Sequence, residues 1–348
     1  MKKKIALTIC TAALLLTGCR ADSAMLIEYS DLNILSSSDV LSLIPAQTSE
    51  PYSTDIAVID YTPETDSAEA ETDPSSDTTA ETDTSSDTQN DYGEPSSETP
   101  GLLVDMTNNE VLYNNLPYKE VAPASLTKMM TALLTLKYGN LDDSVTLTSE
   151  MNQDMISGAQ VCGFVPGDTI TVKELLYSML VFSGNDAANA LAIHVGGSIS
   201  AFVDMMNEEA NLLGAVNTHF SNPSGLDVDN HYSSAYDLYL IFNACMAYDD
   251  FSTAICQPSY TTHYTNSSGD AASVTFTSTN LYMDGTYSSP DGVTVYGGKT
   301  GTTEAAGACL LAYSHDDAGN EYVSLSLGSA DKPELYSQMN KILAKILN

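Results

Sequence analysis

A serine and a lysine stand three residues apart in the segment APASLTKMMTALL, residues 122–134. In a helix, positions i and i+3 share one face, so the side chains of Ser125 and Lys128 would lie together. A lysine held in a dry cleft near another cation loses its proton readily and can then accept the proton of a serine hydroxyl. The positive N-terminal end of the helix would favour the alkoxide as it forms. The pair therefore predicts nucleophilic catalysis by Ser125 with Lys128 as its base.

A second S-x-x-K pattern occurs at Ser329 and Lys332. Lys332 precedes Pro333, and a residue before proline is pushed out of the helical region of backbone space. The two side chains are therefore not expected to share a helical turn. We interpret Ser329 as a loop residue and Lys332 as a solvated surface charge.

Two further motifs carry groups that could work beside the first pair. S-x-N at Ser183–Asn185 follows an apolar helical segment, where a hydroxyl and an amide could project into a cleft. K-T-G at Lys299–Gly301 follows the predicted strand VTVYGG, and its glycine allows another backbone to approach closely. S-x-N recurs at Ser278–Asn280, so each motif alone is weak evidence. The three in this order form a much more specific set.

The set resembles that of the serine D-Ala-D-Ala carboxypeptidases, the low-molecular-mass penicillin-binding proteins. The resemblance covers about residues 101–348 and includes the segments PASLTKMMTALL, SGNDAANALA, FVDMMNEEANLLG, THFSNPSGL, HYSSAYDL and GGKTGTTEAAGACL. It implies a β-lactamase/transpeptidase-like fold and hydrolysis without a cofactor. The implied substrate is the peptidoglycan stem pentapeptide, the product free D-Ala, and the inhibitors β-lactam antibiotics.

The resemblance also implies catalytic roles. Ser125 would be the acylated nucleophile, Lys128 its base, and Ser183 a proton relay in acylation and deacylation. The backbone N–H groups of Ser125 and Thr302 would form the oxyanion hole, where negative charge develops.

The substrate-binding residues implied by the resemblance lie mostly on the K-T-G segment. Asn185 would hold a backbone amide of the substrate, and Lys299 with Thr300 would receive the terminal carboxylate. No arginine occurs from residue 101 to 348, so a bidentate Arg cannot grip that carboxylate. We therefore expect Lys299, helped by the hydroxyls of the neighbouring threonines, to select it alone. The full predicted binding set is Asn185, Lys299, Thr300, Gly301 and Thr302.

The N-terminus has the features of a secretory signal. Lysines at 2–4 are followed by the apolar run Ile5–Leu16, which is too short to span a bilayer. The run ends in Leu-Thr-Gly-Cys at 16–19, which resembles the lipobox of bacterial lipoproteins. We predict a signal peptide over 1–18 and a lipid on Cys19 that anchors the protein to the outer face of the bacterial membrane. The alternative is an ordinary signal peptide with an incidental cysteine.

The composition changes twice along the rest of the chain. Residues 61–100 hold twelve acidic residues and no basic one, with the decamer AETDPSSDTT echoed as AETDTSSDTQ. Low hydrophobicity and like charge predict a disordered linker there. Residues 19–60 are of uncertain order, with a possible strand at 55–60. Residues 101–348 have globular composition and are predicted as the catalytic domain.

Within this domain we expect strands at both ends and helices between them. GLLVDM and EVLYNN indicate a hairpin, Pro123–Lys137 a helix, and residues 150–250 are predicted to be mostly helical. The strands ASVTFTS, GVTVYGG, GACLLAYSH and EYVSLSLG follow, and a helix over 333–347 closes the chain. This order predicts an α/β fold, with one antiparallel sheet built from both ends of the domain, flanked by helices, and an inserted helical lobe.

The net charge and the cysteine content limit the partners and metal sites that can be expected. The formal net charge is −34, because 12 basic residues face 46 acidic ones, so nucleic acid and anionic lipid are not expected as partners. Four cysteines follow Cys19 without C-x-x-C spacing or a histidine grouping, so no metal site is expected. Cys309 is expected in the core, while a Cys245–Cys256 disulfide stays open. His231 is expected to be a hydrogen-bonded loop or core residue.

Three alternative functions remain beside the carboxypeptidase. A β-lactamase of the same fold usually carries Glu-x-x-Leu-Asn between S-x-N and K-T-G, and this chain lacks that pattern. A DD-endopeptidase that cuts crosslinks stays open. A non-catalytic penicillin-sensing or wall-binding lipoprotein is disfavoured, because Ser125, Lys128 and Ser183 are all intact.

The lipobox yields a direct test of anchoring. Cys19→Ala should release the protein into the medium or leave it unprocessed, because no thiol remains to take a lipid. Membrane fractionation with a mass measurement reads out both results. A variant that stays in the membrane at the size of the wild-type protein would show that Cys19 is not the anchor.

Overall fold

The computed structural model describes residues 92–347. The predicted signal peptide, Cys19, the segment 19–60 with its possible strand, and most of the predicted linker lie outside these residues. The last part of that linker, 92–100, runs as a loop along the domain. The backbone N–H of Ser96 donates to Gln338 Oε1 at 2.8 Å, and Asn115 Nδ2 donates to the carbonyl of Thr99 at 2.8 Å. Contacts with the domain thus begin before the predicted boundary at residue 101.

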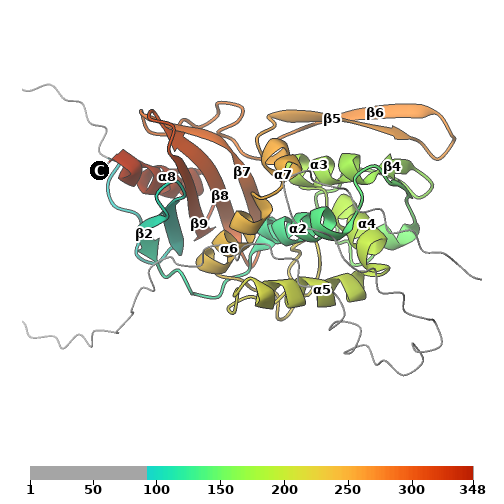
Figure 1. Cartoon of the computed structure of the whole chain (residues 1–348), viewed down its shortest axis with the longest axis horizontal. Coiled ribbons are helices and arrows are strands. Elements are labelled where there is room, and N and C mark those ends of the chain that lie inside the picture. Colours follow the sequence, from blue (N-terminus) through green and yellow to red (C-terminus); the bar gives the residue numbers. More distant parts are fainter. Residues whose placement is uncertain (1–91, 348) are drawn as a thin grey trace, which may run out of the picture. The chain divides into compact units, whose positions relative to one another are not determined.

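Both ends of the domain build one antiparallel sheet, as predicted. Its strands are β1 (Gly101–Asp105), β2 (Glu110–Asn115), β7 (Val293–Thr303), β8 (Gly307–Asp316) and β9 (Glu321–Ser329). The strand order is β2-β1-β9-β8-β7 (Figure 1). The N-terminal hairpin therefore adds to the C-terminal strands through the β1–β9 pair, and β7 is left as an edge strand.

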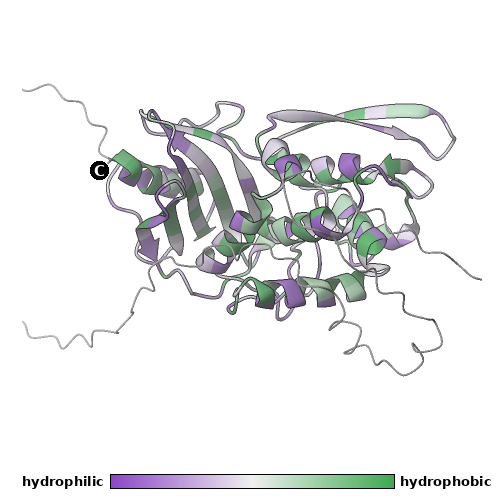
Figure 2. Ribbon diagram, in the orientation of Figure 1, coloured by the Kyte–Doolittle hydropathy of each residue, from purple (hydrophilic) through white to green (hydrophobic). Residues whose placement is uncertain are grey.

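Helices fill the chain between the two halves of the sheet, again as predicted. They are α2 (Lys128–Tyr138), α3 (Val172–Phe182), α4 (Asn185–Gly196), α5 (Ile199–Leu212), α6 (Ala235–Cys245) and α7 (Asp249–Ile255), with the 3-10 turns η2 (Ala124–Thr127) and η3 (Ser149–Asn152). Hydroxyl caps start several of them: Thr171 accepts from the N–H of Glu174 at α3, and Ser234 from that of Asp237 at α6. In Figure 2, α5 carries both hydrophilic and hydrophobic residues, as expected of an amphipathic helix at the surface.

A second sheet was not predicted. It contains β3 (Ser144–Thr146), β4 (Thr169–Thr171), β5 (Ser259–Thr265) and β6 (Ala271–Thr277) in the order β3-β4-β5-β6. The segment ASVTFTS was expected in the main sheet, and this expectation was wrong. Its Phe276 ring stacks on Phe182 and meets Phe164 edge to face, so aromatic packing ties β6 to the helical lobe.

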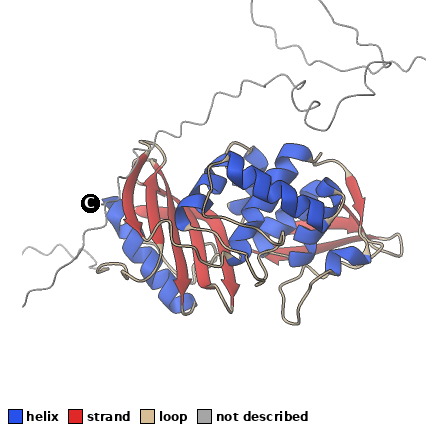
Figure 3. Cartoon of the chain, turned by 90° about the horizontal axis from the view of Figure 1, so that it is seen from below, coloured by secondary structure: helices blue, strands red, loops and turns tan. Residues whose placement is uncertain are grey.

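The main sheet is covered on both faces. The closing helix α8 (Lys332–Leu343), which continues into the 3-10 turn η4 (Ala344–Leu347), packs Leu335 and Tyr336 against Leu310 of β8. The neighbouring Leu311 belongs instead to the large core shared with the helical lobe. Figure 3 shows α8 along one face of the sheet and the lobe beside the other. The predicted fold class is confirmed, and within residues 92–347 no helix combines the length and apolar character needed to cross a membrane.

Candidate active site

Ser125 lies in the 3-10 turn η2, directly before α2. Residues i and i+3 eclipse one another in a 3-10 turn, which aligns Ser125 with Lys128 more closely than an α-helix would. The residue before the serine, Ala124, has a left-handed φ of 47°, an unusual conformation for alanine. The predicted helix therefore begins with a tight, strained turn that holds Ser125, and such strain is characteristic of functional sites.

Two glycines let the backbone close around this turn. A Cβ on Gly301 would come within 2.9 Å of Ala124 Cβ and 3.0 Å of the backbone nitrogen of Ser125. A Cβ on Gly225 would come within 1.9 Å of the Ala124 carbonyl oxygen. The K-T-G glycine is thus required for β7 to pass beside the candidate nucleophile, as the sequence predicted.

Lys128 is fully buried, and its Nζ has three oxygen partners. It lies 2.9 Å from Ser125 Oγ, 2.6 Å from Asn185 Oδ1 and 2.5 Å from the carbonyl of Ser224. The amide and carbonyl oxygens can only accept hydrogen bonds, so they take two N–H groups of the amine. In the neutral amine this leaves a lone pair for the Ser125 hydroxyl, which then donates to Nζ. The geometry suits a general base.

Electrostatics favour the neutral amine. Burial, reinforced by the charge of Lys299, holds the pKa of Lys128 well below its ordinary value. Among the residues that the structure describes, no carboxylate hydrogen-bonds to Lys128 Nζ. The nearby Asp186 is engaged with the backbone N–H groups of Cys162 and Gly163, at 2.8 and 3.0 Å. Asp186 thereby fixes the loop beside the site without neutralising Lys128 directly.

Lys299 and Ser183 form a second pair. Lys299 is 1% exposed, and its Nζ donates to Ser183 Oγ at 2.8 Å and to the carbonyl of Thr300 at 2.9 Å. Burial lowers the pKa of Lys299 to about 7. Ser183 ends α3 with a left-handed φ of 71°, which turns the chain sharply before Asn185 begins α4. The S-x-N motif is thus displayed by a helix-to-helix corner.

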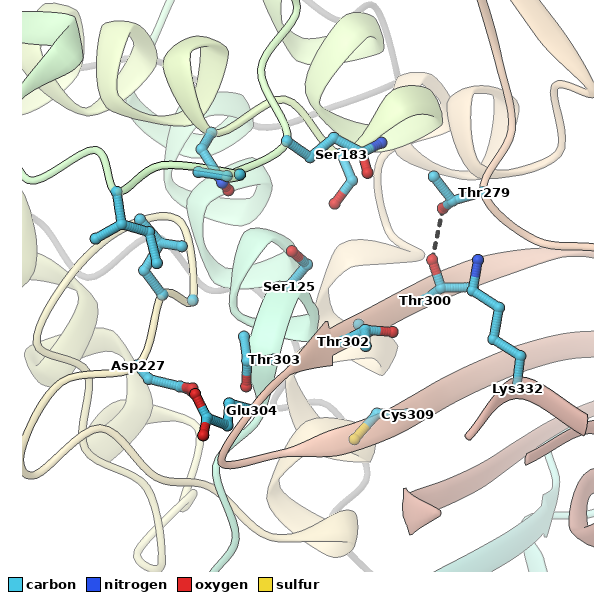
Figure 4. Close-up of a pocket in the computed structure, with 18 of the residues that line it drawn as sticks. Ser125, Ser183, Asp227, Thr279, Thr300, Thr302, Thr303, Glu304, Cys309 and Lys332 are labelled. Atoms are coloured by element: carbon cyan, nitrogen blue, oxygen red, sulfur yellow. Dashed lines mark hydrogen bonds between the residues drawn. The ribbon is translucent and has the colours of Figure 1, made fainter. Parts of the chain in front are cut away.

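The two pairs meet at a cleft of about 540 Å³. Figure 4 shows Ser125 and Ser183 facing this space, with Thr300 and Thr302 along one wall. The predicted catalytic and binding residues lie together in the structure. Six of them line the cleft: Ser125, Ser183, Asn185, Thr300, Gly301 and Thr302. Lys128 and Lys299 do not line it, because they are buried behind Ser125 and Ser183.

Ser329 and Lys332, the second S-x-x-K pattern, lie on different elements, as expected, but the interpretation of Ser329 as a loop residue was wrong. Ser329 is not a loop residue: it ends strand β9, and its hydroxyl is buried without a hydrogen-bond partner among residues 92–347. Lys332 is exposed, as expected, and begins α8. A strand end and a helix start project the two side chains from different elements, so they cannot work as a serine–lysine pair.

His231 is a core histidine, as predicted. The N–H of Ser221 donates to its Nδ1 at 2.9 Å, so Nε2 carries the proton and donates to Thr127 Oγ1 at 2.8 Å. Burial lowers its pKa to about 4, which keeps the ring neutral. Cys245 and Cys256 are not paired, and Cys309 is buried as expected. Among the described residues, no His, Cys, Asp and Glu side chains group in a way that could hold a metal ion.

Several cleft residues escaped the sequence reasoning. Thr279, whose hydroxyl lies 2.5 Å from that of Thr300, sits in a loop as the middle residue of the second S-x-N pattern, to which no role was assigned. Asp227 and Glu304 line one part of the cleft, and Lys332 lines another. Glu304 lies three residues beyond the K-T-G motif, and this closeness in sequence could have indicated it.

The comparisons with known proteins agree with this geometry. The family description of D-alanyl-D-alanine carboxypeptidases, peptidase S11, matches residues 89–330. The chain belongs to this family. The match spans the S-x-x-K pair at Ser125 and Lys128, the S-x-N motif at 183–185 and the K-T-G motif at 299–301, and it ends close to the end of strand β9.

Individual relatives are of moderate similarity. D-alanyl-D-alanine carboxypeptidase DacF of Bacillus subtilis is 33% identical over 247 residues, which cover 70% of this chain and 60% of the relative. DacD of Escherichia coli K12 is 30% identical over 251 residues, covering 70% and 61%. This chain therefore spans about 60% of the length of these two relatives.

Solved structures share the fold. The DD-transpeptidase of Streptomyces K15 superposes with a TM-score of 0.67 at 27% identity and covers 74% of this chain and all of its own. The D-alanyl-D-alanine carboxypeptidase of Mycobacterium tuberculosis H37Rv gives a TM-score of 0.62 at 28% identity, covering 73% of this chain and 92% of its own.

The approach of β7 to the candidate nucleophile predicts a sharp effect of one methyl group. Gly301→Ala should cut acylation by roughly a hundredfold or more, because even a small shift of reacting groups is costly. Stopped-flow labelling with a fluorescent penicillin measures the rate. Gly269→Ala is the control: in the β5–β6 turn its Cβ meets no neighbour, and its φ of 89° means that it adds backbone strain away from the site without the contact to Ser125. Equal acylation rates in the two variants would show that this contact does not position Ser125.

The burial of Lys299 predicts a pH-dependent cost in stability. The pKa of Lys299 is about 7 in the folded protein and has its ordinary, higher value in the unfolded chain. Between these two pH values the unfolded chain binds one more proton than the folded protein, so the free energy of unfolding decreases as the pH falls toward 7. Lys299→Met should therefore be more stable than wild type at pH 7, by roughly 1–3 kcal/mol after losing two hydrogen bonds. The advantage should shrink toward pH 10. Urea denaturation at both pH values, with Lys341→Met as the control, tests this; an advantage independent of pH would contradict it.

Proposed function

We propose that this protein is a serine DD-carboxypeptidase that removes the terminal D-Ala from peptidoglycan stem pentapeptides. The observation that carries the proposal is the hydrogen bond between Lys128 Nζ and Ser125 Oγ, formed by a buried amine whose other two partners are acceptors only. Membership of the peptidase S11 family supports the substrate class.

Acylation begins with proton transfer from Ser125 to the neutral amine of Lys128. Ser125 Oγ attacks the carbonyl carbon of the penultimate D-Ala, and the oxyanion that forms accepts hydrogen bonds from the backbone N–H groups of Ser125 and Thr302. The C–N bond then breaks, and the leaving amine of D-Ala takes up a proton that Ser183 relays. An ester between Ser125 and the shortened peptide remains.

Deacylation reverses these roles with water as the nucleophile. Water loses a proton to the same basic centre and attacks the ester carbonyl, and the released Ser125 oxygen regains a proton. Because Lys128 must be neutral in the free enzyme, kcat/KM should rise with pH through its lowered pKa. The ammonium of Lys299, hydrogen-bonded to Ser183 Oγ, supports the relay by orienting that hydroxyl.

Substrate binding follows from the exposed edge of β7. An extended peptide can lie along an edge strand as an added strand, with main-chain hydrogen bonds to it. Asn185, held through its oxygen by Lys128, presents its amide N–H₂ to a substrate carbonyl. Thr300, Gly301 and Thr302 form the floor beneath the scissile bond, and Lys299 lies beneath Thr300.

The proposed location is outside the cytoplasmic membrane. The predicted signal peptide would direct export, and a lipid on Cys19 would anchor the enzyme to the outer face of the cytoplasmic membrane. The acidic linker would let the catalytic domain reach the cell wall. β-Lactam antibiotics would inhibit it by acylating Ser125.

The nucleophile assignment has a direct test. Ser125→Ala should abolish covalent labelling by a fluorescent penicillin, and Lys128→Ala should reduce it strongly, because an unactivated serine is a poor nucleophile. Ser329→Ala is the matched control from the second S-x-x-K pattern and should label normally. Labelling that persists in Ser125→Ala and disappears in Ser329→Ala would overturn the assignment.

The activity is tested with two substrates. Wild-type protein should release free D-Ala from a stem pentapeptide, and Ser125→Ala should release none. Cleavage of a crosslinked dimer without D-Ala release from the pentapeptide would identify an endopeptidase instead. Penicillin turnover without action on either peptide would identify a β-lactamase.

A further inference from the structure

The second S-x-N pattern, at residues 278–280, has no role in the chemistry proposed above. It follows strand β6, which ends at Thr277, and its middle residue Thr279 lines the cleft. Asn280 is only 1% exposed, although asparagine is usually a surface residue. A buried amide has to find partners for both its oxygen and its nitrogen. The partners of Asn280 therefore show what this segment holds together.

The side chain of Asn280 joins the segment to strand β7. Its Nδ2 donates to the carbonyl of Gly297 at 3.2 Å, and its Oδ1 accepts the N–H of Tyr282 at 3.2 Å. A carbonyl oxygen can only accept and a backbone N–H can only donate, so these two partners fix the orientation of the amide. The contact reaches β7 two residues before Lys299 of the K-T-G motif.

Strand β7 is irregular at this point. The β7–β8 register shifts between Val295 and Gly297, and Gly298 has a φ of 139°, a conformation that favours glycine. A bulge of this kind bends a strand and changes the direction of the side chains that follow it. β7 is also an edge strand of the main sheet, so β8 holds it from one side only. The direction in which Lys299 leaves the bulge therefore depends on contacts from outside this sheet, and Asn280 supplies one of them.

Thr279 joins the same segment to the helix that carries the S-x-N motif of the site. Its backbone N–H donates to the carbonyl of Val181 at 3.3 Å, in the last turn of α3. The last carbonyls of a helix have no partner within the helix, so this bond caps α3 directly before Ser183. The Thr279 hydroxyl lies 2.5 Å from that of Thr300, as the dashed line in Figure 4 marks. One short segment thus contacts both α3 and the K-T-G strand.

The segment is supported from behind by α8. The N–H of Leu281 donates to Tyr336 Oη at 2.7 Å, and Tyr282 Oη donates to Asn340 Oδ1 at 2.7 Å. The Tyr336 ring also stacks on Tyr287, with the ring centroids 4.2 Å apart. The bridge between α3 and β7 therefore rests on a packed aromatic support.

This bridge runs beside the hydrogen bond between Lys299 Nζ and Ser183 Oγ. Lysine has a long, flexible side chain, so that bond alone leaves the spacing of the two backbones loosely defined. The contacts at 279–280 involve backbone groups and a short amide, which define the spacing more tightly. They also place the backbone of Thr302, whose N–H belongs to the oxyanion hole of the proposed mechanism.

We propose that Asn280, with the backbone of Thr279, is a positioning residue for acylation. It fixes strand β7 relative to Ser183, so that Lys299 and the N–H of Thr302 meet the reacting groups in the right place. Asn280 is not among the described residues that line the cleft, so it acts through β7 and not on the substrate. The inference rests on the proposed function, because acylation of the candidate serine is the step that it serves.

The test removes the donor without changing the size of the side chain. Asn280→Asp keeps an oxygen for the N–H of Tyr282 and loses the N–H that donates to Gly297. Stopped-flow labelling with a fluorescent penicillin gives the acylation rate constant and the dissociation constant of the complex that precedes acylation. The rate constant should fall by roughly ten- to a hundredfold, because small displacements of reacting groups are costly. The dissociation constant should change by less than about threefold, because the penicillin still finds the same cleft.

Asn340→Asp is the matched control. In the described part of the chain, Asn340 accepts from Tyr282 Oη and donates to the carbonyl of Ser288 at 3.0 Å, and neither bond involves β7. It should therefore acylate at the wild-type rate, even where its melting temperature falls. Asn280→Ser, whose hydroxyl is too short to reach Gly297, is a second variant and should slow acylation as Asn280→Asp does. All rates are measured well below the melting temperatures.

Several results would overturn the inference. These are a wild-type acylation rate constant in folded Asn280→Asp or Asn280→Ser, an equal loss in Asn340→Asp, or a loss confined to the dissociation constant. A crystal structure of a slowed variant in which β7 keeps its place relative to Ser183 would do the same. If neither Asn280 variant folds, Asn280 supports the whole fold and the inference is wrong. Failure of the wild type to release D-Ala from a pentapeptide would remove the carboxypeptidase function, while penicillin acylation would still decide the role of Asn280.

Discussion

The site depends on the burial of two lysine side chains in one small region, where neither has a carboxylate partner among residues 92–347. Removing an ammonium group from water costs several kcal/mol unless it loses its proton or finds strong hydrogen bonds. Within the described part of the chain, the partners of Lys128 and Lys299 are hydroxyl, amide and carbonyl oxygens. In a chain of net charge −34, acidic residues are plentiful, so their exclusion from these two amines is a specific feature of the fold. Without a carboxylate partner, the pKa of Lys128 stays low, so its amine is neutral and has a lone pair that can accept a proton.

This electrostatic arrangement needs three elements to meet closely. The turn η2 supplies Ser125, the α3–α4 corner supplies Ser183 and Asn185, and β7 supplies Lys299. Unusual backbone conformations occur at two of these contacts, at Ala124 and at Ser183. The surrounding core has to hold that strain. The large apolar cluster shared by the helical lobe and the sheet does so, since it contains both Ala124 and residues of α3 and β8.

The main features of the fold were accessible from sequence because they follow local periodicity. The hairpin at 101–115, the helical middle and the closing strands all carry regular apolar patterns. The second sheet was missed because its strands β3 and β4 have three residues each and its β6 strand is held by aromatic contacts to distant helices. Those contacts join Phe276 to residues 94 and 112 positions earlier in the chain, so no local window contains them.

The catalytic motifs were found because their spacing follows from the turns that carry them, as Ser125 and Lys128 illustrate. The rest of the cleft comes from residues whose local sequence carries no sign of it. Thr279 is one of many threonines, and Lys332 reads as a surface charge because it stands before a proline in a polar stretch. Their place in the cleft depends on the β7–β8 pairing and on how α8 packs across Leu310. Residue type and spacing therefore predict the candidate reacting groups, while the place of the other cleft residues depends on the packing of the whole domain.

This division has a consequence for the surface around the site. A strongly acidic protein repels an anionic substrate at long range, so attraction has to act within the cleft itself. A buried cation would do this at a high cost in stability, and the lowered pKa values of the buried Lys128 and Lys299 reflect that cost. An exposed lysine at the cleft wall costs little, because water and salt solvate it when no substrate is bound. Lys332, on the first turn of α8, thus adds positive charge to the cleft at little cost in stability, whereas Lys128 and Lys299 lie buried behind the candidate serines.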